Sequence, residues 1–234
     1  MSKRSKRYEQ STKLVDVAKA YTLSEAVKIV KEFQSAKFDE SVAINFQLGI
    51  RPDQPTEAVR GTAALPHGSG KKIRVLCFAK GEAQRAAEQA GADYVGAEDY
   101  VKKVEGGWLD FDAVVAHPDM MREISKLGKI LGPRGLMPTP KTGTVTADVD
   151  KAIKEIKAGR VEFKSDKTSG VHVLCGKRSF SEQALLENVK SVIKAVLDAK
   201  PQASKGDYLK RVSISASQNP GITLRATSMS VQDS

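Results

Sequence analysis

The chain has 234 residues, enough for one large domain or two modest ones that each bury a core. Its 38 lysine and arginine residues outnumber 28 acidic ones, and the formal net charge of +10 favours an anionic partner. No apolar run reaches the roughly 18 residues of a membrane span, and no apolar signal core follows the basic residues 1–7. We therefore expect a cytoplasmic protein without a membrane contact. Cys77 and Cys175, far apart in apolar runs, are expected to be reduced core residues.

The first third of the chain predicts a helix and a half-buried strand. Thr22 and Glu25 have capping-box spacing and open a helix in which Ala26, Val30 and Phe33 share a face. Residues 42–48 alternate between apolar side chains and the smaller or polar Ala43, Asn45 and Gln47, as expected for a strand with one solvated face. Residues 51–55 contain two prolines and predict a loop.

From Lys72 onward, strand-like and helix-like segments alternate. The predicted strands are 73–79, 93–95 and 111–116, and the predicted helices are 82–90, 98–104, 118–130 and 148–157. This alternation is typical of a parallel sheet with helices on its faces. Residues 68–159 hold 15 basic and 13 acidic side chains, whereas the flanking segments together hold 23 and 15. We therefore expect a nearly neutral, Rossmann-like α/β domain at 68–159, inserted into a basic discontinuous domain built from 1–67 and 160–234.

The C-terminal flank predicts antiparallel strands and one long helix. Residues 161–165 and 170–175 read as a hairpin around a turn at 166–169, and Ser179 with Glu182 has the spacing of a helix cap. Residues 212–217 alternate strictly, and the final dozen residues are polar enough to predict disorder. Helices beside antiparallel strands make this domain α+β.

The segment 128–144 has a composition that indicates a functional loop. It combines four glycines and three prolines with basic residues and no acid, so we expect an irregular loop without a regular helix. An ordered basic loop of this length is usually functional, although a plain interdomain hinge would have a similar composition.

The polar side of residues 212–217 presents Ser213, Ser215 and Ser217, whose hydroxyls suit phosphate and ribose 2′-OH groups. If the alternating strands pair, Lys164, Asn45 and Gln47 share that open face. Phe38 precedes the strand at 42–48, where an exposed ring could stack on a base. An ordinary solvated sheet with Phe38 in the core would give the same pattern.

Motifs for catalysis, cofactors and metals are missing. Residues 65–72 do not fit GxxxxGK[ST], and the turn after 73–79 carries Gly81 alone where GxGxxG is required. His67, His117 and His172 lack metal-ligand spacing, and no serine lies in GxSxG. We expect no catalytic residue, no cofactor and no metal.

Several segments together resemble the bacterial ribosomal protein L1 family of the large-subunit stalk. They are 60–71, 91–96, 111–116, 128–144 and 156–163, in the family's order. The resemblance implies a structural protein that is monomeric within the ribosome. Its discontinuous domain, built from 1–67 and 160–234, would bind large-subunit rRNA. It also implies transient contact of the inserted domain with exit-site tRNA, assisting its release, and repression of the protein's own mRNA.

The expected rRNA contacts combine this resemblance with the open face. They are Lys37, Phe38, Asp39, Glu40, Lys164, Asp166, Lys167, His172, Ser213, Ser215, Ser217, Gln218 and Asn219. The expected tRNA contacts are Lys129, Arg134 and Lys141. The family usually has Thr-Met-Gly where this chain has Ser217, Gln218 and Asn219. Serine keeps the hydroxyl of threonine, whereas Gln218 and Asn219 replace an apolar side chain and a glycine, so we expect the local backbone and its fit to RNA to differ from the family's. The alternatives are a basic RNA- or DNA-binding chaperone without ribosomal specificity and an enzyme that uses the α/β insert.

Overall fold

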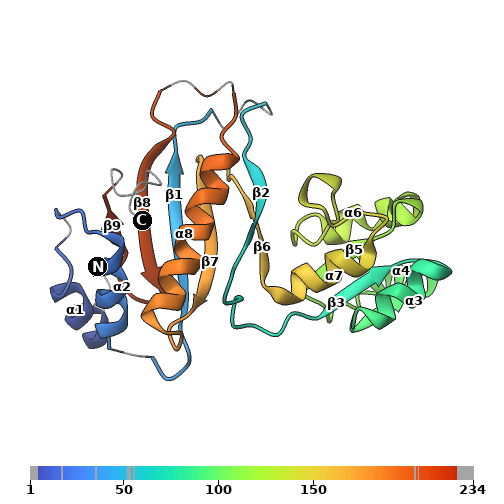
Figure 1. Ribbon diagram of the computed structural model, residues 1–234, viewed down its shortest axis with the longest axis horizontal. Helices are drawn as coiled ribbons and strands as arrows, with labels where there is room; N and C mark the ends of the chain where they lie inside the picture. The colour runs from blue at the N-terminus through green and yellow to red at the C-terminus, as the bar shows by residue number, and fades with distance from the viewer. Residues whose placement is uncertain are drawn as a thin grey trace. The chain divides into compact units, whose positions relative to one another are not determined.

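The computed structural model describes residues 5–225 except 17, 35, 52, 53, 55, 203 and 205. The chain divides into two compact units (Figure 1). Unit 1 comprises residues 1–70 and 161–234, and unit 2 comprises residues 71–160. The protein thus has mixed α/β architecture, with an antiparallel sheet in unit 1 and a parallel sheet in unit 2.

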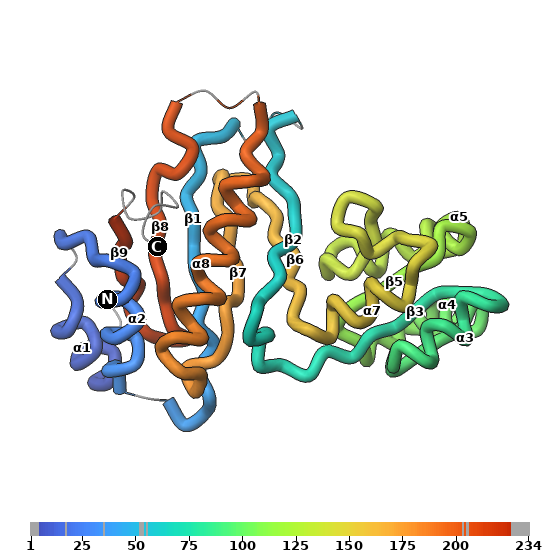
Figure 2. Tube along the Cα trace, in the orientation of Figure 1, coloured from blue at the N-terminus to red at the C-terminus, as the bar shows by residue number. Residues whose placement is uncertain are grey.

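Unit 1 is built on a four-stranded antiparallel sheet of order β7-β1-β8-β9. The strands are β1 (Ser41–Leu48), β7 (Gly170–Lys177), β8 (Leu209–Ala216) and β9 (Ile222–Leu224), and Figure 2 shows their chains side by side. The alternation predicted for 42–48 and for 212–217 is confirmed, because Val42, Ile44, Val212 and Ile214 are all buried. One face of this sheet therefore lies against the core. On the other, which we call the open face, the side chains of the described strand residues are partly or fully exposed.

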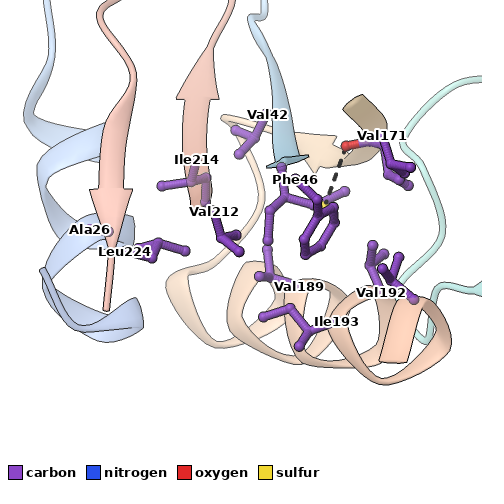
Figure 3. Packing of buried hydrophobic residues seen from close by; sticks show 14 of the residues in the cluster. Ala26, Val42, Phe46, Val171, Val189, Val192, Ile193, Val212, Ile214 and Leu224 are labelled. Atoms are coloured by element: carbon purple, nitrogen blue, oxygen red, sulfur yellow. Dashed lines mark hydrogen bonds between the residues drawn. The ribbon is translucent and has the colours of Figure 1, made fainter. Parts of the chain in front are cut away.

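Two helices cover the buried face. They are α2 (Leu23–Glu32) and α8 (Glu182–Asp198), and the short helix α1 (Lys6–Lys13) precedes them. The predicted Thr22 capping box is present, since Thr22 Oγ1 accepts from the Glu25 N–H and the Glu25 carboxylate accepts from the Thr22 N–H. Figure 3 shows Val189, Val192 and Ile193 of α8 facing the strand residues, so helix and sheet enclose a single core.

Two local predictions in unit 1 are wrong. The strands β6 (Arg160–Lys164) and β7 form no hairpin, because β6 pairs with β2 (Arg60–Ala64) in a separate two-stranded sheet and only an isolated Ser165–Val171 bridge links the two segments. The turn residues signal a reversal but do not choose the partner strand. The cap of α8 is Ser181, whose hydroxyl accepts from the Ala184 N–H, and not Ser179.

Unit 2 contains a parallel sheet of order β4-β3-β5 with helices on both faces. The strands are β3 (Val75–Phe78), β4 (Tyr94–Gly96) and β5 (Ala113–Ala116), and the longer helices are α3 (Glu82–Gln89), α4 (Glu98–Glu105) and α7 (Val149–Ala158). Val75 and Cys77 pack toward α3 and α7, whereas Leu76 and Phe78 pack toward α4 and the segment after β5. This double burial explains why β3 reads as an unbroken apolar run.

The segment from Pro118 to Leu131 differs from the single helix predicted there. It runs as η1 (Pro118–Met120), α5 (Met121–Ile124), η2 (Ser125–Leu127) and α6 (Gly128–Leu131). The predicted loop at 128–144 therefore begins with one helical turn, and it also holds η3 (Pro140–Thr142). Buried Met120, Ile124, Leu127 and Leu131 keep helical spacing throughout, so packing tolerates the alternation of α and 3-10 turns.

Four further expectations concern the cysteines, the chain end, the loop at 51–55 and membrane-spanning helices. Cys77 and Cys175 are both free and buried, as predicted, and burial raises the pKa of each thiol to about 12. Of the final dozen residues, Thr223 and Leu224 belong to β9, and those from 226 onward lie outside the described residues. Much of the predicted loop at 51–55 lies outside them too. Among the described helices, none has the length and apolarity to cross a bilayer.

Candidate nucleic-acid interface

A row of four polar side chains crosses the open face of the unit 1 sheet. Asn45 of β1 is the register partner of His172 in β7 and of Ser213 in β8, and Ser213 is in turn the partner of Thr223 in β9. All four are at least partly exposed. The row offers an imidazole, an amide and two hydroxyls, which are groups that hydrogen-bond to phosphate and to ribose hydroxyls.

Hydrogen bonds hold part of this row in a fixed arrangement. The Asn45 side-chain amide donates to Ser215 Oγ at 3.2 Å, and its oxygen lies 2.8 Å from His172 Nδ1. The Asn45 oxygen can only accept, so Nδ1 donates to it, and the other ring nitrogen, Nε2, lies 3.8 Å from the Asp166 carboxylate. At the far edge, Arg211 donates to Thr223 Oγ1 at 3.1 Å. A ligand would therefore meet oriented groups at little entropic cost.

The exposed ring of Phe38 lies on a short loop between α2 and β1. Phe38 is 50% exposed, so the alternative that places it in the core is excluded. Its neighbour Asp39 anchors the loop, because the Asp39 carboxylate accepts from the Ser179 N–H at 3.2 Å and from the Ser179 hydroxyl at 2.8 Å. Lys37 is exposed beside them. The Phe38 ring is thus exposed to solvent on an anchored loop beside the positive charge of Lys37, an arrangement suited to stacking on a base.

Glu40 ends this loop in the interior, although we expected it on the contact surface. Its side chain is 0% exposed, and its carboxylate accepts from the Ala36 N–H at 2.7 Å and from the Asn219 amide at 2.7 Å. Two guanidinium groups pair with it, Arg7 at 3.2 Å and Arg178 at 3.6 Å. A buried carboxylate needs such partners, so Glu40 positions its neighbours.

The turn after β8 brings the next three expected residues to the same end of the sheet. Ser217 Oγ accepts from the Ser41 N–H at 3.2 Å and lies 3.3 Å from the Ser41 oxygen, which ties the end of β8 to the start of β1. Gln218 has a left-handed backbone at φ 60°, and Asn219 reaches Glu40. The hydroxyl of Ser217 is therefore engaged within the protein and does not simply face outward.

The turn between β6 and β7 carries Asp166, Lys167 and Thr168. The Asp166 carboxylate accepts from the Thr168 hydroxyl, the Thr168 N–H and the Gly170 N–H, each at 2.7 Å, and the Thr168 hydroxyl is the main cause of the lowered pKa of Asp166. Gln47 donates to the Thr168 oxygen at 2.8 Å, which joins the turn to the open face. Lys167 is exposed at the tip of this turn.

The expectation that Lys164 shares the open face with Asn45 and Gln47 is wrong. Lys164 is the last residue of β6, and β6 belongs to the two-stranded sheet with β2. The lysine is exposed but stands on a different sheet. The expectation depended on the hairpin that does not form.

Three residues of the open face were missed. Thr223 was not predicted because a three-residue strand such as β9 gives no periodic signal, and Arg211 of β8 lies one position before the strand predicted at 212–217. Leu174, the third, is 50% exposed and is the register partner of Ala43. Its place on the outward side of β7 could have been read from the alternation with buried Val173 and Cys175.

In unit 2 the basic side chains Lys129, Arg134 and Lys141 are all exposed on the segment 128–144. Three threonines stiffen this segment, since Thr142 Oγ1 lies 2.9 Å from Thr139 Oγ1 and 3.0 Å from Thr144 Oγ1. Buried Leu131 anchors the segment in the core. These basic groups are thus presented by an ordered loop, not by a loose linker.

Within the described part of the chain, no cluster of three or more His, Cys, Asp or Glu side chains could hold a metal ion. In a comparison with known protein families, the sequence model of the Ribosomal protein L1p/L10e family matches residues 30–220 of this chain. This is a family of structural, rRNA-binding proteins of the large ribosomal subunit, and it is not an enzyme family. Since the match spans most of the sequence and both units, the chain belongs to the ribosomal protein L1p/L10e family.

Proposed function

We propose that unit 1 holds the protein on the rRNA of the large-subunit stalk through the open sheet face and the adjoining loop and turn. The observation that carries this proposal is the row of His172, Asn45, Ser213 and Thr223 across four strands. Phe38 adds a stacking ring, and Lys37 and Lys167 add charge at exposed positions. Ribose and phosphate contacts of this kind recognise the shape of a folded RNA, whose deep major groove excludes side chains.

The affinity should depend on salt, because lysine and arginine contacts to phosphate release bound counterions. The decisive measurement is the affinity for the stalk fragment of large-subunit rRNA beside an unrelated folded RNA of equal length, over a salt series. A preference of about 10³-fold or more at physiological salt supports specific recognition. Equal affinities that fall together as salt rises would instead indicate a general basic nucleic-acid chaperone.

For unit 2 we propose a Rossmann-like insert that meets the elbow of exit-site tRNA transiently and assists its release. Its parallel order β4-β3-β5 supports the fold, and exposed Lys129, Arg134 and Lys141 support the contact. The nearly neutral remainder of the unit suits a weak interaction. Replacing these three residues by glutamine should slow tRNA release from ribosomes without changing affinity for stalk rRNA. Unchanged release would refute the assignment.

Repression of the protein's own mRNA forms the last part of the proposal. The same open face would bind a leader segment that shares the fold of the stalk RNA, so the two RNAs must compete. A competition experiment tests this directly: the unlabelled stalk fragment should displace the labelled leader RNA at a concentration set by its own affinity. Simultaneous binding of both RNAs would contradict a shared site.

A further inference from the structure

Helix α1 is attached to unit 1 largely through polar contacts at one end of the sheet. Arg7 donates to Glu40 Oε1 at 3.2 Å and to Gln218 Oε1 at 2.9 Å, and Ser11 Oγ lies 3.2 Å from Asn219 Oδ1. Ser11 is the one buried residue of the helix. The docking site is thus the point where β8 ends, β1 begins and the Phe38 loop turns inward.

The helix has little stability of its own. Eight residues are too few for an isolated helix in water, and its polar composition gives it almost no apolar face to bury. Ser5 caps it by accepting from the Tyr8 N–H at 3.3 Å, but capping alone does not hold a helix in place. Its position is held by the pairing of Arg7 with the fully buried carboxylate of Glu40, by buried Ser11, and by Val15, which follows the helix and lies in the core.

This docking leaves the remaining charges of the helix in solvent. Arg7 is occupied by Glu40 and Gln218, whereas Lys6 and Lys13 are exposed, with Glu9 as the single acidic residue of the helix. Lys37, on the loop that Glu40 ends, is also exposed. Arg7 and Ser11 dock the helix at the turn 217–219, so the exposed Lys6 and Lys13, seven positions apart and hence on one side of the helix, are carried beside this turn, where a polyanion that reaches it would meet them.

We propose that helix α1 is a further part of the RNA-binding surface and supplies Lys6 and Lys13 as phosphate contacts. The proposal rests on the rRNA-binding function of unit 1 proposed above. Gln218 and Asn219 then serve the interface indirectly, because they hold α1 beside it. This gives the two side chains a role that does not require either of them to touch RNA.

The test compares the salt dependence of rRNA binding in three full-length proteins. They are the wild type, the double variant Lys6→Gln/Lys13→Gln, and the control Lys190→Gln/Lys194→Gln. The control lysines are exposed on α8, which covers the face of the sheet opposite the open face. Each lost phosphate contact lowers the slope of log affinity against log salt by about 1. We expect a slope lower by about 2 for the α1 variant and an unchanged slope for the control.

The outcomes separate this inference from the proposed function. If the wild type prefers stalk rRNA and the α1 variant keeps the wild-type slope, α1 is not a contact surface and the inference alone is overturned. If the wild type shows no preference for stalk rRNA, the proposed function fails and the inference falls with it. A slope that drops equally in both variants would indicate loss of net charge without a local contact, and would also overturn it.

A second variant tests the docking itself. Arg7→Gln removes the ion pair with Glu40 while Lys6 and Lys13 remain, so amide hydrogen exchange should accelerate in residues 6–13. If the docked helix places the lysines on the RNA, this variant should lose about the same salt slope as the double lysine variant. Faster exchange with a wild-type slope would show that the position of α1 is irrelevant to binding, which contradicts the proposal.

Discussion

The carboxylate of Glu40 and the side-chain amide of Asn219 meet at 2.7 Å, although 179 positions separate the two residues in the sequence. The other Glu40 oxygen accepts from the Ala36 N–H and pairs with Arg7. One buried carboxylate thus links helix α1, the Phe38 loop and the turn after β8. Because these three segments form one end of the candidate interface, its geometry depends on a residue that the solvent does not reach.

Replacing Glu40 by alanine should destabilise unit 1 strongly. The change leaves the guanidinium groups of Arg7 and Arg178 without their carboxylate, removes the acceptor of the Ala36 N–H, and leaves the Asn219 amide with only its bond to the Ser217 oxygen. Breaking a buried ion pair from one side typically costs about 3–5 kcal/mol of unfolding free energy. Urea unfolding followed by circular dichroism would measure this cost.

Glu40→Gln is the matched control, because glutamine keeps the shape and one acceptor oxygen and loses the charge. It should lie between the wild type and Glu40→Ala in unfolding free energy. If Glu40→Ala unfolds at the same urea concentration as the wild type, the carboxylate does not hold the three segments together.

Replacing Phe38 by alanine should weaken rRNA binding and leave stability almost unchanged. The ring is half exposed, so little core packing is lost, whereas stacking of an aromatic ring on a base is worth about 1–3 kcal/mol. The affinity should therefore fall by about one order of magnitude, measured by fluorescence anisotropy with the labelled stalk fragment. Phe38→Leu, which keeps apolar bulk without a π-face, should bind nearly as weakly as alanine. Full affinity in the leucine variant would indicate simple apolar burial in place of stacking.

The alternating strands were predictable because the two-residue alternation of apolar and polar side chains indicates a strand and also shows which of its side chains face the core. Val212 and Ile214 are buried and Ser213 and Ser215 face outward, as the pattern requires. The helix at 149–158 was predictable for a similar reason, and Gly159 ends it with a left-handed backbone. Such elements depend on residues that are close together in the sequence, so a single sequence is enough to predict them.

Pairing partners and buried charge were not predictable in this way. The choice of β2 as the partner of β6 depends on contacts about one hundred residues away, so the turn at 166–169 suggested a hairpin that does not form. Glu40 carries the same side chain whether exposed or buried, and its burial requires Arg7, Arg178 and Asn219, which come from three distant segments. The row of polar side chains on the open face could not be predicted either, because it depends on the pairing register of four strands.

The hydrogen bonds to the Asp166 carboxylate should make the free energy of unfolding depend on pH. The Thr168 hydroxyl and the Gly170 N–H, by bonding to the carboxylate, hold the pKa of Asp166 below its ordinary value of 3.8. A lowered folded-state pKa means that this contribution is complete above the unfolded pKa and is lost as pH falls through the folded one. Urea midpoints of the wild type and Asp166→Asn should thus differ at pH 7 and converge as the pH falls below the ordinary value of 3.8 and through the lower folded-state pKa of Asp166. A constant difference across this range would exclude the carboxylate charge as the cause.

Unit 1 should fold and bind rRNA without unit 2. Every residue of the unit 1 core cluster lies between Val15 and Leu65 or between Phe163 and Leu224, so none is lost when residues 71–160 are replaced by a flexible linker. All the proposed rRNA contacts lie in the retained segments as well. The shortened protein should therefore show a cooperative unfolding transition and keep the preference of the full chain for the stalk fragment over an unrelated RNA. The tRNA-directed residues Lys129, Arg134 and Lys141 are absent from it, so it should fail to assist tRNA release when assembled into ribosomes. A shortened protein that folds cooperatively but binds both RNAs equally would contradict the division of labour, because recognition would then require residues of unit 2.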